Sequence, residues 1–270
     1  MTKRSLGQHF LYDPSILKRI IDAAMLSPED TVVEIGPGPG RLTRMLAERV
    51  RKVIAIELDK VLYNELKTAL SEYGNIELIA GDALKYPYET LEEFKVVANI
   101  PYSITTPLLF RLFEERGHLR SITLTVQKEV AGRIVAGPGS REYGILSIMA
   151  QYYGRPRIVF PVPRGAFRPV PKVDSAVIRM ELYEKPPVSV IDEKLFFRVI
   201  RASFSQRRKT LANALKPFGE DMKERLLQAG IEPARRAETV SMSEFAVLSD
   251  ILSKAAQGVR TVLSLNEGSA

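Results

Sequence analysis

The sequence predicts an α/β protein with a doubly wound parallel sheet, followed by a small C-terminal helical domain. Short aliphatic and β-branched runs of strand length recur about twenty residues apart, at 31–35, 53–57, 76–80 and 95–98. Amphipathic stretches typical of helices lie between some of these runs, at 41–50 and 59–71. Strands that alternate with helices in this way are typical of parallel sheets with helical crossovers.

The strand pattern continues into the second half of the chain. We expect further strands at 121–126, 145–152 and 173–182. The third of these runs alternates apolar and polar residues with a period of two, which is typical of a half-buried strand.

After Glu184 the pattern changes. Lys185-Pro186-Pro187 is a natural break, and 192–257 is typical of short helices. Ser241 and Glu244 have the spacing of a capping box at the start of the last helix. We therefore expect two domains, 1–184 and 185–270.

Composition excludes several classes of protein. The chain has no cysteine, which excludes disulfides, thiol nucleophiles and cysteine-bound iron–sulfur clusters. Only two histidines are present, so neither a zinc site nor a catalytic triad is expected. No apolar run approaches the roughly 18 residues of a membrane span, and the N-terminus lacks the apolar segment of a secretory signal. We expect a cytoplasmic protein with no bound metal and no membrane contact.

Positive charge is concentrated in the later part of the chain. Residues 1–100 hold 13 Lys and Arg against 15 Asp and Glu, whereas 101–270 hold 26 against 17. Two stretches, 155–172 and 201–216, each carry five positive charges and no acid. A solvated surface explains one such stretch, but two together favour a nucleic-acid surface.

Polar groups follow each of the first four predicted strands, where open α/β sheets bind their ligands. The first strand leads into a glycine loop, Gly36-Pro37-Gly38-Pro39-Gly40, which lets a ligand approach the backbone closely. Glu57, about twenty residues further on, suits a carboxylate that binds two ribose hydroxyls. Asp82 follows the third strand and suits an acceptor for an adenine amino group. One acidic residue after a strand is usually a helix cap, but this set indicates a nucleoside site.

The glycine spacing distinguishes between nucleoside cofactors. Nicotinamide cofactors prefer G-x-G-x-x-G, whereas this loop reads G-x-G-x-G, and Arg41 follows it. The chain has no G-x-x-x-x-G-K-[ST] motif, so a phosphate-cradling NTPase loop is not expected. The loop resembles that of S-adenosylmethionine-dependent methyltransferases.

The fourth strand ends in Asn99-Ile100-Pro101-Tyr102, which resembles the signature of enzymes that methylate exocyclic amino groups. The adenine amino nitrogen is a poor nucleophile because its lone pair is delocalised into the ring. The Asn99 amide oxygen and the carbonyl of Ile100 or Pro101 are able to accept its two hydrogens, and the fixed φ of proline helps to aim the carbonyl. Tyr102 is suited to stack on an extruded base. Because the sulfonium methyl is already a strong electrophile, positioning is expected to supply most of the catalysis.

Nearly the whole chain resembles the small-subunit ribosomal RNA adenine N6-dimethyltransferases. The resemblance rests on GQHFLYD (7–13), VEIGPGPGRLT (33–43), IELD (56–59), GDAL (81–84), NIPYSITTPL (99–108), VQKEVAGR (126–133), FRPVPKVDSAV (167–177) and FSQRRKTLANAL (204–215). It implies a Rossmann-like methyltransferase sheet that binds S-adenosyl-L-methionine in residues 1–184, and a helical RNA-binding domain in 185–270. It further implies dimethylation of two adjacent adenines near the 3′ end of that RNA, within an immature small ribosomal subunit, by a monomer.

The resemblance also implies roles for individual residues. The cofactor site would be lined by His9, Leu11, Gly36, Gly38, Glu57, Asp82 and Asn99. Asn99, Pro101 and Tyr102 would hold the adenine, with Phe167 closing its other face. Arg207, Arg208 and Lys209 would bind RNA. At His9 the chain departs from the family pattern, because many relatives have asparagine at this position.

Two other functions remain open from sequence alone. The same architecture serves enzymes that methylate large-subunit RNA and confer antibiotic resistance, although 167–177 and 204–215 resemble the small-subunit group better. The second alternative is an assembly factor that binds immature subunits without catalysis. Such a factor would have no need of Glu57, Asp82 and the 99–102 motif.

Overall fold

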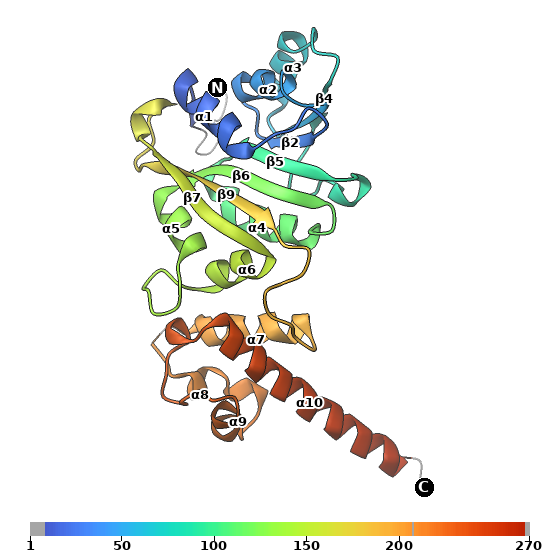
Figure 1. The fold of residues 1–270 in the computed structure, drawn as a ribbon, viewed down its shortest axis with the longest axis vertical. Coiled ribbons are helices and arrows are strands. Elements are labelled where there is room, and N and C mark those ends of the chain that lie inside the picture. Colours follow the sequence, from blue (N-terminus) through green and yellow to red (C-terminus); the bar gives the residue numbers. More distant parts are fainter. Residues whose placement is uncertain (1–8, 207, 268–270) are drawn as a thin grey trace. The chain divides into compact units, whose positions relative to one another are not determined.

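The computed structural model describes residues 9–206 and 208–267, and it divides into two compact units (Figure 1). The first unit contains the residues up to Val135 together with Tyr153–Glu184, and the second contains Ala136–Tyr152 and the residues from Lys185 onward. This division differs in one respect from the expected single boundary at residue 184, because Ala136–Tyr152 belongs to the second unit.

The first unit is built on a seven-stranded sheet with the order β4-β3-β2-β5-β6-β9-β7. The strands are β2 (Thr31–Ile35), β3 (Lys52–Glu57), β4 (Ile76–Ala80), β5 (Phe94–Asn99), β6 (Leu119–Gln127), β7 (Gly154–Val162) and β9 (Ser175–Leu182). The five strands β2 to β6 run parallel, as predicted. The predicted doubly wound sheet is confirmed, whereas β9, whose direction was not predicted, runs antiparallel to both β6 and β7. The sheet is therefore mixed.

The helices of the first unit are α1 (Pro14–Ala24), α2 (Arg41–Ala47), α3 (Lys60–Ala69), α4 (Thr105–Glu114) and α5 (Lys128–Val135). Of these, α2, α3 and α4 connect consecutive parallel strands. Asp13 caps α1 and Asp59 caps α3, each accepting hydrogen bonds from two backbone N–H groups of its helix. Apolar residues of α1 and α2, among them Ile20 and Leu46, pack against one face of the sheet together with Val32, Val97 and Val177. The predicted strands and helices of residues 31–98 are confirmed.

A second, two-stranded sheet lies in the same unit. β1 (Phe10–Leu11) pairs antiparallel with β8 (Phe167–Arg168), so that Leu11 lies opposite Phe167. This pairing joins the N-terminal motif to the 167–177 motif, and neither segment had been predicted as a strand. Short 3-10 helices complete the two units at Tyr88–Thr90, Tyr102–Ile104, Arg164–Ala166, Lys216–Phe218 and Ala237–Thr239.

One predicted strand was wrong, and one strand of the seven-stranded sheet was missed. Residues 145–152 form helix α6 (Ile145–Tyr153), because a short run of apolar residues carries too little periodicity to separate a strand from a buried helix. The next residues form strand β7, although they include Pro156 and Pro161. Proline is tolerated there because β7 is the edge strand and pairs only with β9.

The second unit is helical, as expected. Besides α6 it contains α7 (Glu193–Ser205), α8 (Leu211–Ala214), α9 (Met222–Gln228) and α10 (Met242–Glu267). Its core contains Phe196, Phe204, Leu211, Leu226 and Phe245. The predicted capping box is confirmed: the Ser241 N–H donates to Glu244 Oε2 at 2.7 Å, and the Glu244 N–H donates to Ser241 Oγ at 3.2 Å. Within the part of the chain that the structure describes, no helix has the length and apolar character needed to cross a membrane.

Candidate active site

The polar groups that follow β2, β3, β4 and β5 meet at the carboxyl edge of the sheet. The Gly36 N–H donates to the Ile56 carbonyl at 2.9 Å, which joins the ends of β2 and β3. The Gly81 N–H donates to the Glu57 carbonyl at 2.9 Å, which joins the ends of β3 and β4. Backbone hydrogen bonds therefore fix the positions of the residues from which a nucleoside site was predicted.

The glycine loop after β2 has a conformation that suits glycine. Gly36 and Gly38 have φ values of 66° and 56°, in the left-handed region that side chains disfavour. A Cβ atom at Gly38 would lie 2.6 Å from Cδ1 and Cε1 of Phe10. The loop thus passes directly against the N-terminal strand β1.

Glu57, the last residue of β3, is 2% exposed. Its Oε2 accepts from the Gly38 N–H at 3.2 Å, and its Oε1 accepts from the Asp59 N–H at 2.9 Å. Burial raises the pKa of Glu57, and the N–H groups of Asp59 and Gly38 oppose this by stabilising the carboxylate. Each carboxylate oxygen keeps further lone pairs, so this carboxylate is able to accept two hydroxyl groups.

A second buried carboxyl group, Glu34, lies near Glu57. Glu34 is 2% exposed, and its Oε2 has no hydrogen-bond partner among the described residues. Burial raises the pKa of Glu34 to about 8, an effect that the Thr43 hydroxyl opposes and the Glu57 carboxylate reinforces. The sequence placed Glu34 at the end of the first strand but assigned it no function, and the only signal was an acidic residue inside an otherwise apolar run.

Asp82 follows β4 and is partly exposed. Its Oδ1 accepts from the Leu84 N–H at 2.9 Å, which is the local turn that an aspartate commonly forms. The structure thus places Asp82 at the expected edge of the sheet.

Asn99 ends β5 and is held by the N-terminal segment. Its Nδ2 donates to the His9 carbonyl at 3.0 Å, while its Oδ1 is buried with no hydrogen-bond partner among the described residues. A carbonyl only accepts, so this contact fixes which end of the amide carries the nitrogen. An unpaired buried acceptor is costly, and Asn99 Oδ1 is therefore poised to accept a hydrogen bond from a ligand.

Tyr102 is held in the 3-10 turn after Pro101. Its hydroxyl lies 2.6 Å from Ser175 Oγ, and its ring centroid lies 5.6 Å from that of His9. The His9 ring is anchored in turn, with Nδ1 2.7 Å from the Pro169 carbonyl. Ser175 had not been singled out in the sequence, and a contact that spans 73 residues leaves no local signal there.

A small cavity connects these groups. It is lined by His9, Phe10, Gly36, Asn99, Ile100, Pro101 and Tyr102, and has a volume of about 20 Å³. The cavity holds little more than one water molecule.

Among the predicted site residues that do not line this cavity, Leu11 and Phe167 lie in the core. The side chains of Leu11 and Phe167 are 4% and 0% exposed, and both belong to the core beneath α1. The expectation that the Phe167 ring covers a bound base would require that ring to leave the core. In the described arrangement, β8 instead supports β1, which carries Phe10 beside the glycine loop.

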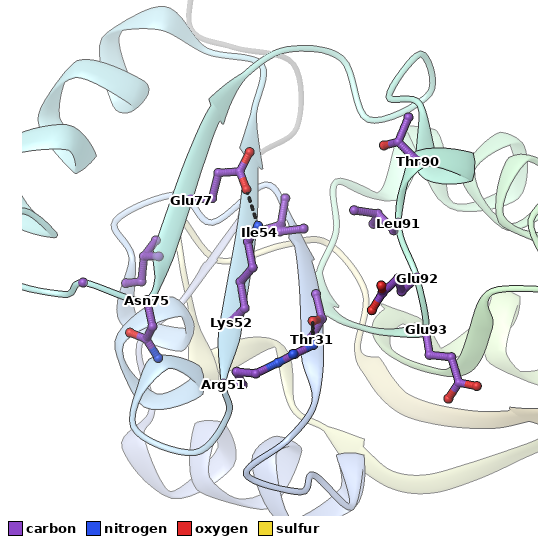
Figure 2. A pocket seen from close by; sticks show the side chains of 12 residues that line it. Thr31, Arg51, Lys52, Ile54, Asn75, Glu77, Thr90, Leu91, Glu92 and Glu93 are labelled. Carbon is purple, nitrogen blue, oxygen red and sulfur yellow. Dashed lines mark hydrogen bonds and ion pairs between the residues drawn. The ribbon is translucent and has the colours of Figure 1, made fainter.

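A separate groove lies at the other edge of the sheet. Figure 2 shows this groove, about 560 Å³, which includes Thr31, Lys52 and Ile76 at the amino ends of β2, β3 and β4. Lys52 and Glu77, on the neighbouring strands β3 and β4, form an ion pair of 2.7 Å on one side of the groove. Its position at the amino ends separates it from the predicted site. Among the described residues, no group of three or more His, Asp or Glu side chains is arranged to hold a metal ion.

The predicted RNA-binding residues lie between α7 and α8 in the second unit. Arg208 and Lys209 are exposed there. Arg207 lies outside the described residues.

Comparisons with known proteins agree with the geometry. A family model for ribosomal RNA adenine dimethylase matches residues 1–254. A ribosomal RNA small subunit methyltransferase A from Geobacillus thermodenitrificans is 48% identical over 265 residues, covering 93% of this chain and 90% of the relative. A protein of the same name from Clostridium botulinum is 48% identical over 256 residues, covering 92% and 93%.

Two solved structures resemble the chain over most of its length. A dimethyladenosine transferase from Plasmodium falciparum has a TM-score of 0.75 and 29% identity, covering 89% of this chain and 96% of that one. The 23S rRNA methyltransferase ErmE has a TM-score of 0.71 and 29% identity, covering 90% and 99%.

Proposed function

The chain belongs to the ribosomal RNA adenine dimethylase family, and on this premise we propose how its residues carry out the reaction. It is an S-adenosyl-L-methionine-dependent enzyme that dimethylates adenine in small-subunit ribosomal RNA. We propose that its targets are the exocyclic N6 atoms of two adjacent adenines near the 3′ end. The observation that carries the proposal is the buried, unpaired Oδ1 of Asn99 at the end of β5.

The cofactor site is proposed to lie along the ends of β2, β3 and β4. The acceptors present there match the cofactor: Glu57 would bind the ribose hydroxyls, and Asp82 the adenine amino group. Gly36 and Gly38 would let the cofactor approach the backbone closely. When bound, the cofactor supplies an electrophilic methyl group on a positively charged sulfur.

The substrate adenine is proposed to bind at the turn after β5. Asn99 Oδ1 accepts a hydrogen bond from one N6 hydrogen. The other N6 hydrogen is proposed to bond to the Ile100 carbonyl, because the Pro101 carbonyl already accepts from the Ile104 N–H at 3.1 Å. Both acceptors draw the N6 lone pair out of conjugation with the ring and toward the methyl group. Each of the two transfers replaces one N6 hydrogen by a methyl group, and the released proton passes to solvent, because neither amide oxygen is basic enough to keep it.

Tyr102 is proposed to stack on the extruded base. Ser175 Oγ fixes the hydroxyl end of its ring, so the ring is oriented before the base arrives. His9 lines the same cavity from the opposite segment and is held by the Pro169 carbonyl. We propose that His9 and Tyr102 separate to admit the base, and that Phe167 supports β1 from below.

The alternatives from the sequence are weaker. Curated relatives at 48% identity are named for the small subunit, whereas the large-subunit enzyme ErmE is 29% identical. A factor without catalysis would not need the unpaired acceptor at Asn99, which costs stability in the absence of a ligand.

We further propose that the substrate is the RNA within an immature small subunit and that the enzyme acts as a cytoplasmic monomer. The catalytic role would belong to the first unit. Arg207, Arg208 and Lys209 would give the second unit a role in RNA binding.

The proposal is tested with methyl-labelled cofactor and immature small subunits, followed by nucleoside analysis of digested RNA. Large subunits serve as the competing substrate, and an Asn99→Ala variant controls for adventitious label. N6,N6-dimethyladenosine at adjacent positions, with monomethyl species only as intermediates, is the expected product. Label in the large subunit, or a product that stays monomethylated at long times, would contradict the proposal.

A further inference from the structure

Two arginines lie directly opposite each other on the outer strands of the sheet. Arg157 on β7 pairs in register with Arg179 on β9, so their side chains leave the same face. Like charges in such positions destabilise a sheet unless a negative group lies between them. On the same two strands, Arg155 pairs with Glu181, the one acidic residue of β7 and β9.

Arg179 is buried and incompletely paired. It is 6% exposed, and its Nη1 donates to Glu181 Oε1 at 2.5 Å. Its Nε has no hydrogen-bond partner among the described residues. Thr123, the β6 residue in register with Arg179, also has a buried hydroxyl without such a partner. This part of the face therefore holds donors that lack an acceptor.

A fourth arginine, Arg19 of α1, adds positive charge to this face. Arg19 lies over the ring of Phe160, with Cζ 3.8 Å from the ring centroid. Phe160 lies opposite Val177, two residues before Arg179, so all of these side chains share the face that α1 covers. Arg19, Arg155 and Arg157 are exposed. We call Arg19, Arg155, Arg157 and Arg179 the arginine cluster.

One carboxylate does not balance this cluster. The hydrogen bond from Arg179 lowers the pKa of Glu181, and the charges of Arg179, Arg157 and Arg155 act in the same direction. Four guanidinium groups against Glu181 leave three positive charges in excess. A phosphate matches this need, because a guanidinium group donates two parallel hydrogen bonds to phosphate oxygens.

One member of the cluster, Arg179, lies on β9, the strand that reaches the candidate active site. Ser175, which bonds Tyr102, begins β9, and Arg179 lies four residues further along, or about 13 Å. An RNA strand whose base enters the site is able to pass over this face within a few nucleotides.

We propose that the arginine cluster binds backbone phosphate of the substrate RNA, close to the target adenine and separately from residues 207–209. This inference rests on the proposed function, because it takes the RNA to be the substrate. The cluster would fix the register of the RNA while the site itself selects the base.

The test compares Arg157→Gln with Arg157→Lys, which keeps the charge, and with Arg49→Gln. Arg49 is an exposed arginine of the same unit, located between α2 and β3 at the amino edge of the sheet. A fluorescent RNA fragment from the 3′ end of the small-subunit RNA is titrated at several salt concentrations. Methylation kinetics and thermal unfolding are measured on the same preparations.

Arg157→Gln is expected to reduce the slope of log affinity against log salt by about 0.7, the value for one phosphate contact on single-stranded RNA. The RNA KM should rise while kcat at saturating RNA stays that of the parent. The unfolding temperature should not fall, because the change removes a like charge opposite Arg179. Arg157→Lys should restore most of the slope, and Arg49→Gln should leave it unchanged. An unchanged slope in Arg157→Gln would overturn the proposal. The arginines would then serve to keep the edge strand β7 from pairing with another chain.

Failure of the proposed function would look different. In that case the parent protein would not methylate the fragment or the immature subunit, whatever the salt slope. A normal methylation rate with an unchanged slope in Arg157→Gln would reject the arginine cluster alone.

Discussion

The side-chain amide of Asn99 donates to the main-chain carbonyl of His9 at 3.0 Å, across 90 residues of sequence. This contact leaves Asn99 Oδ1 as a buried acceptor without a partner among the described residues. The N-terminal segment therefore orients the group that we propose to activate the adenine nitrogen. Because the tether uses a carbonyl of the main chain, it does not depend on the histidine side chain.

Asn99→Ala is expected to lower the rate of both methyl transfers by about 100-fold or more, the cost of removing one preorganised hydrogen bond from a transition state. RNA binding should change little, because Asn99 acts on the nitrogen and does not anchor the RNA. Single-turnover methylation measures the effect. His9→Ala keeps the carbonyl and should lose less activity, so equal losses in the two variants would contradict this assignment.

Glu57→Ala is expected to weaken S-adenosylmethionine binding by about 1.5–3 kcal/mol, the contribution of charge-assisted hydrogen bonds to a ribose. Calorimetric titration gives the affinity. Glu65→Ala, an exposed glutamate on α3, is the matched control and should bind normally. Unchanged affinity in a folded Glu57→Ala protein would exclude Glu57 from the cofactor site.

Gly38→Ala is expected to disturb both the glycine loop and β1. The new Cβ would meet the Phe10 ring at 2.6 Å, and its φ of 56° would cost roughly 1–2 kcal/mol in backbone strain. Cofactor affinity and unfolding temperature should both fall. Adding Phe10→Ala should relieve the steric clash but leave the backbone strain. A double-mutant cycle measures the coupling between positions 10 and 38. Additive effects of the two changes would show that Phe10 does not contact the loop.

The parts of the structure that depend on local pattern could be predicted from the sequence. The ends of β2, β3, β4 and β5 were identified because each apolar run stops at a glycine or a polar residue. The assignment of 145–152 as a strand was wrong because its uniform apolar character has no period. β7 was missed because prolines and arginines mask an edge strand.

The rest depends on contacts between distant segments. The pairing of Leu11 with Phe167 buries both side chains, and no local pattern separates such residues from those that line a ligand site. The contacts Asn99–His9 and Tyr102–Ser175 likewise join separate motifs. The sequence therefore predicted which chemical groups form the site, but their hydrogen-bond partners could be identified only from the fold.

Reversing the charges of Arg207, Arg208 and Lys209 is expected to weaken RNA binding and flatten its dependence on salt. When a phosphate contact is lost, fewer counterions leave the RNA on binding. The slope of log affinity against log salt should therefore fall by about 0.7 for each lost contact. Cofactor affinity should stay unchanged, because the glycine loop belongs to the other unit. Titrations of RNA at several salt concentrations and of cofactor at one measure both effects. A parent-like salt slope would leave this segment as a solvated surface.

Glu34 is expected to make stability fall as the pH rises. Its pKa is about 8 in the folded protein against 4.5 for an ordinary glutamate, so between these values the folded state holds a proton that the unfolded state has lost. Raising the pH therefore favours unfolding, by up to about 1.4 kcal/mol per pH unit and on the order of a few kcal/mol in total. Glu34→Gln keeps a neutral group of similar size and should remove this dependence.

Denaturant unfolding of the cofactor-free protein from pH 5 to pH 8 measures the effect of Glu34. The free energy of unfolding of Glu34→Gln should approach that of the parent at pH 5 and exceed it at pH 8. Glu48→Gln, an exposed glutamate at the end of α2, should follow the parent at every pH. Parallel curves for the parent and Glu34→Gln would mean that Glu34 is ionised in the folded protein across this range. Its charge would then be held by the neighbouring donors, because an unpaired buried carboxylate is too costly to persist.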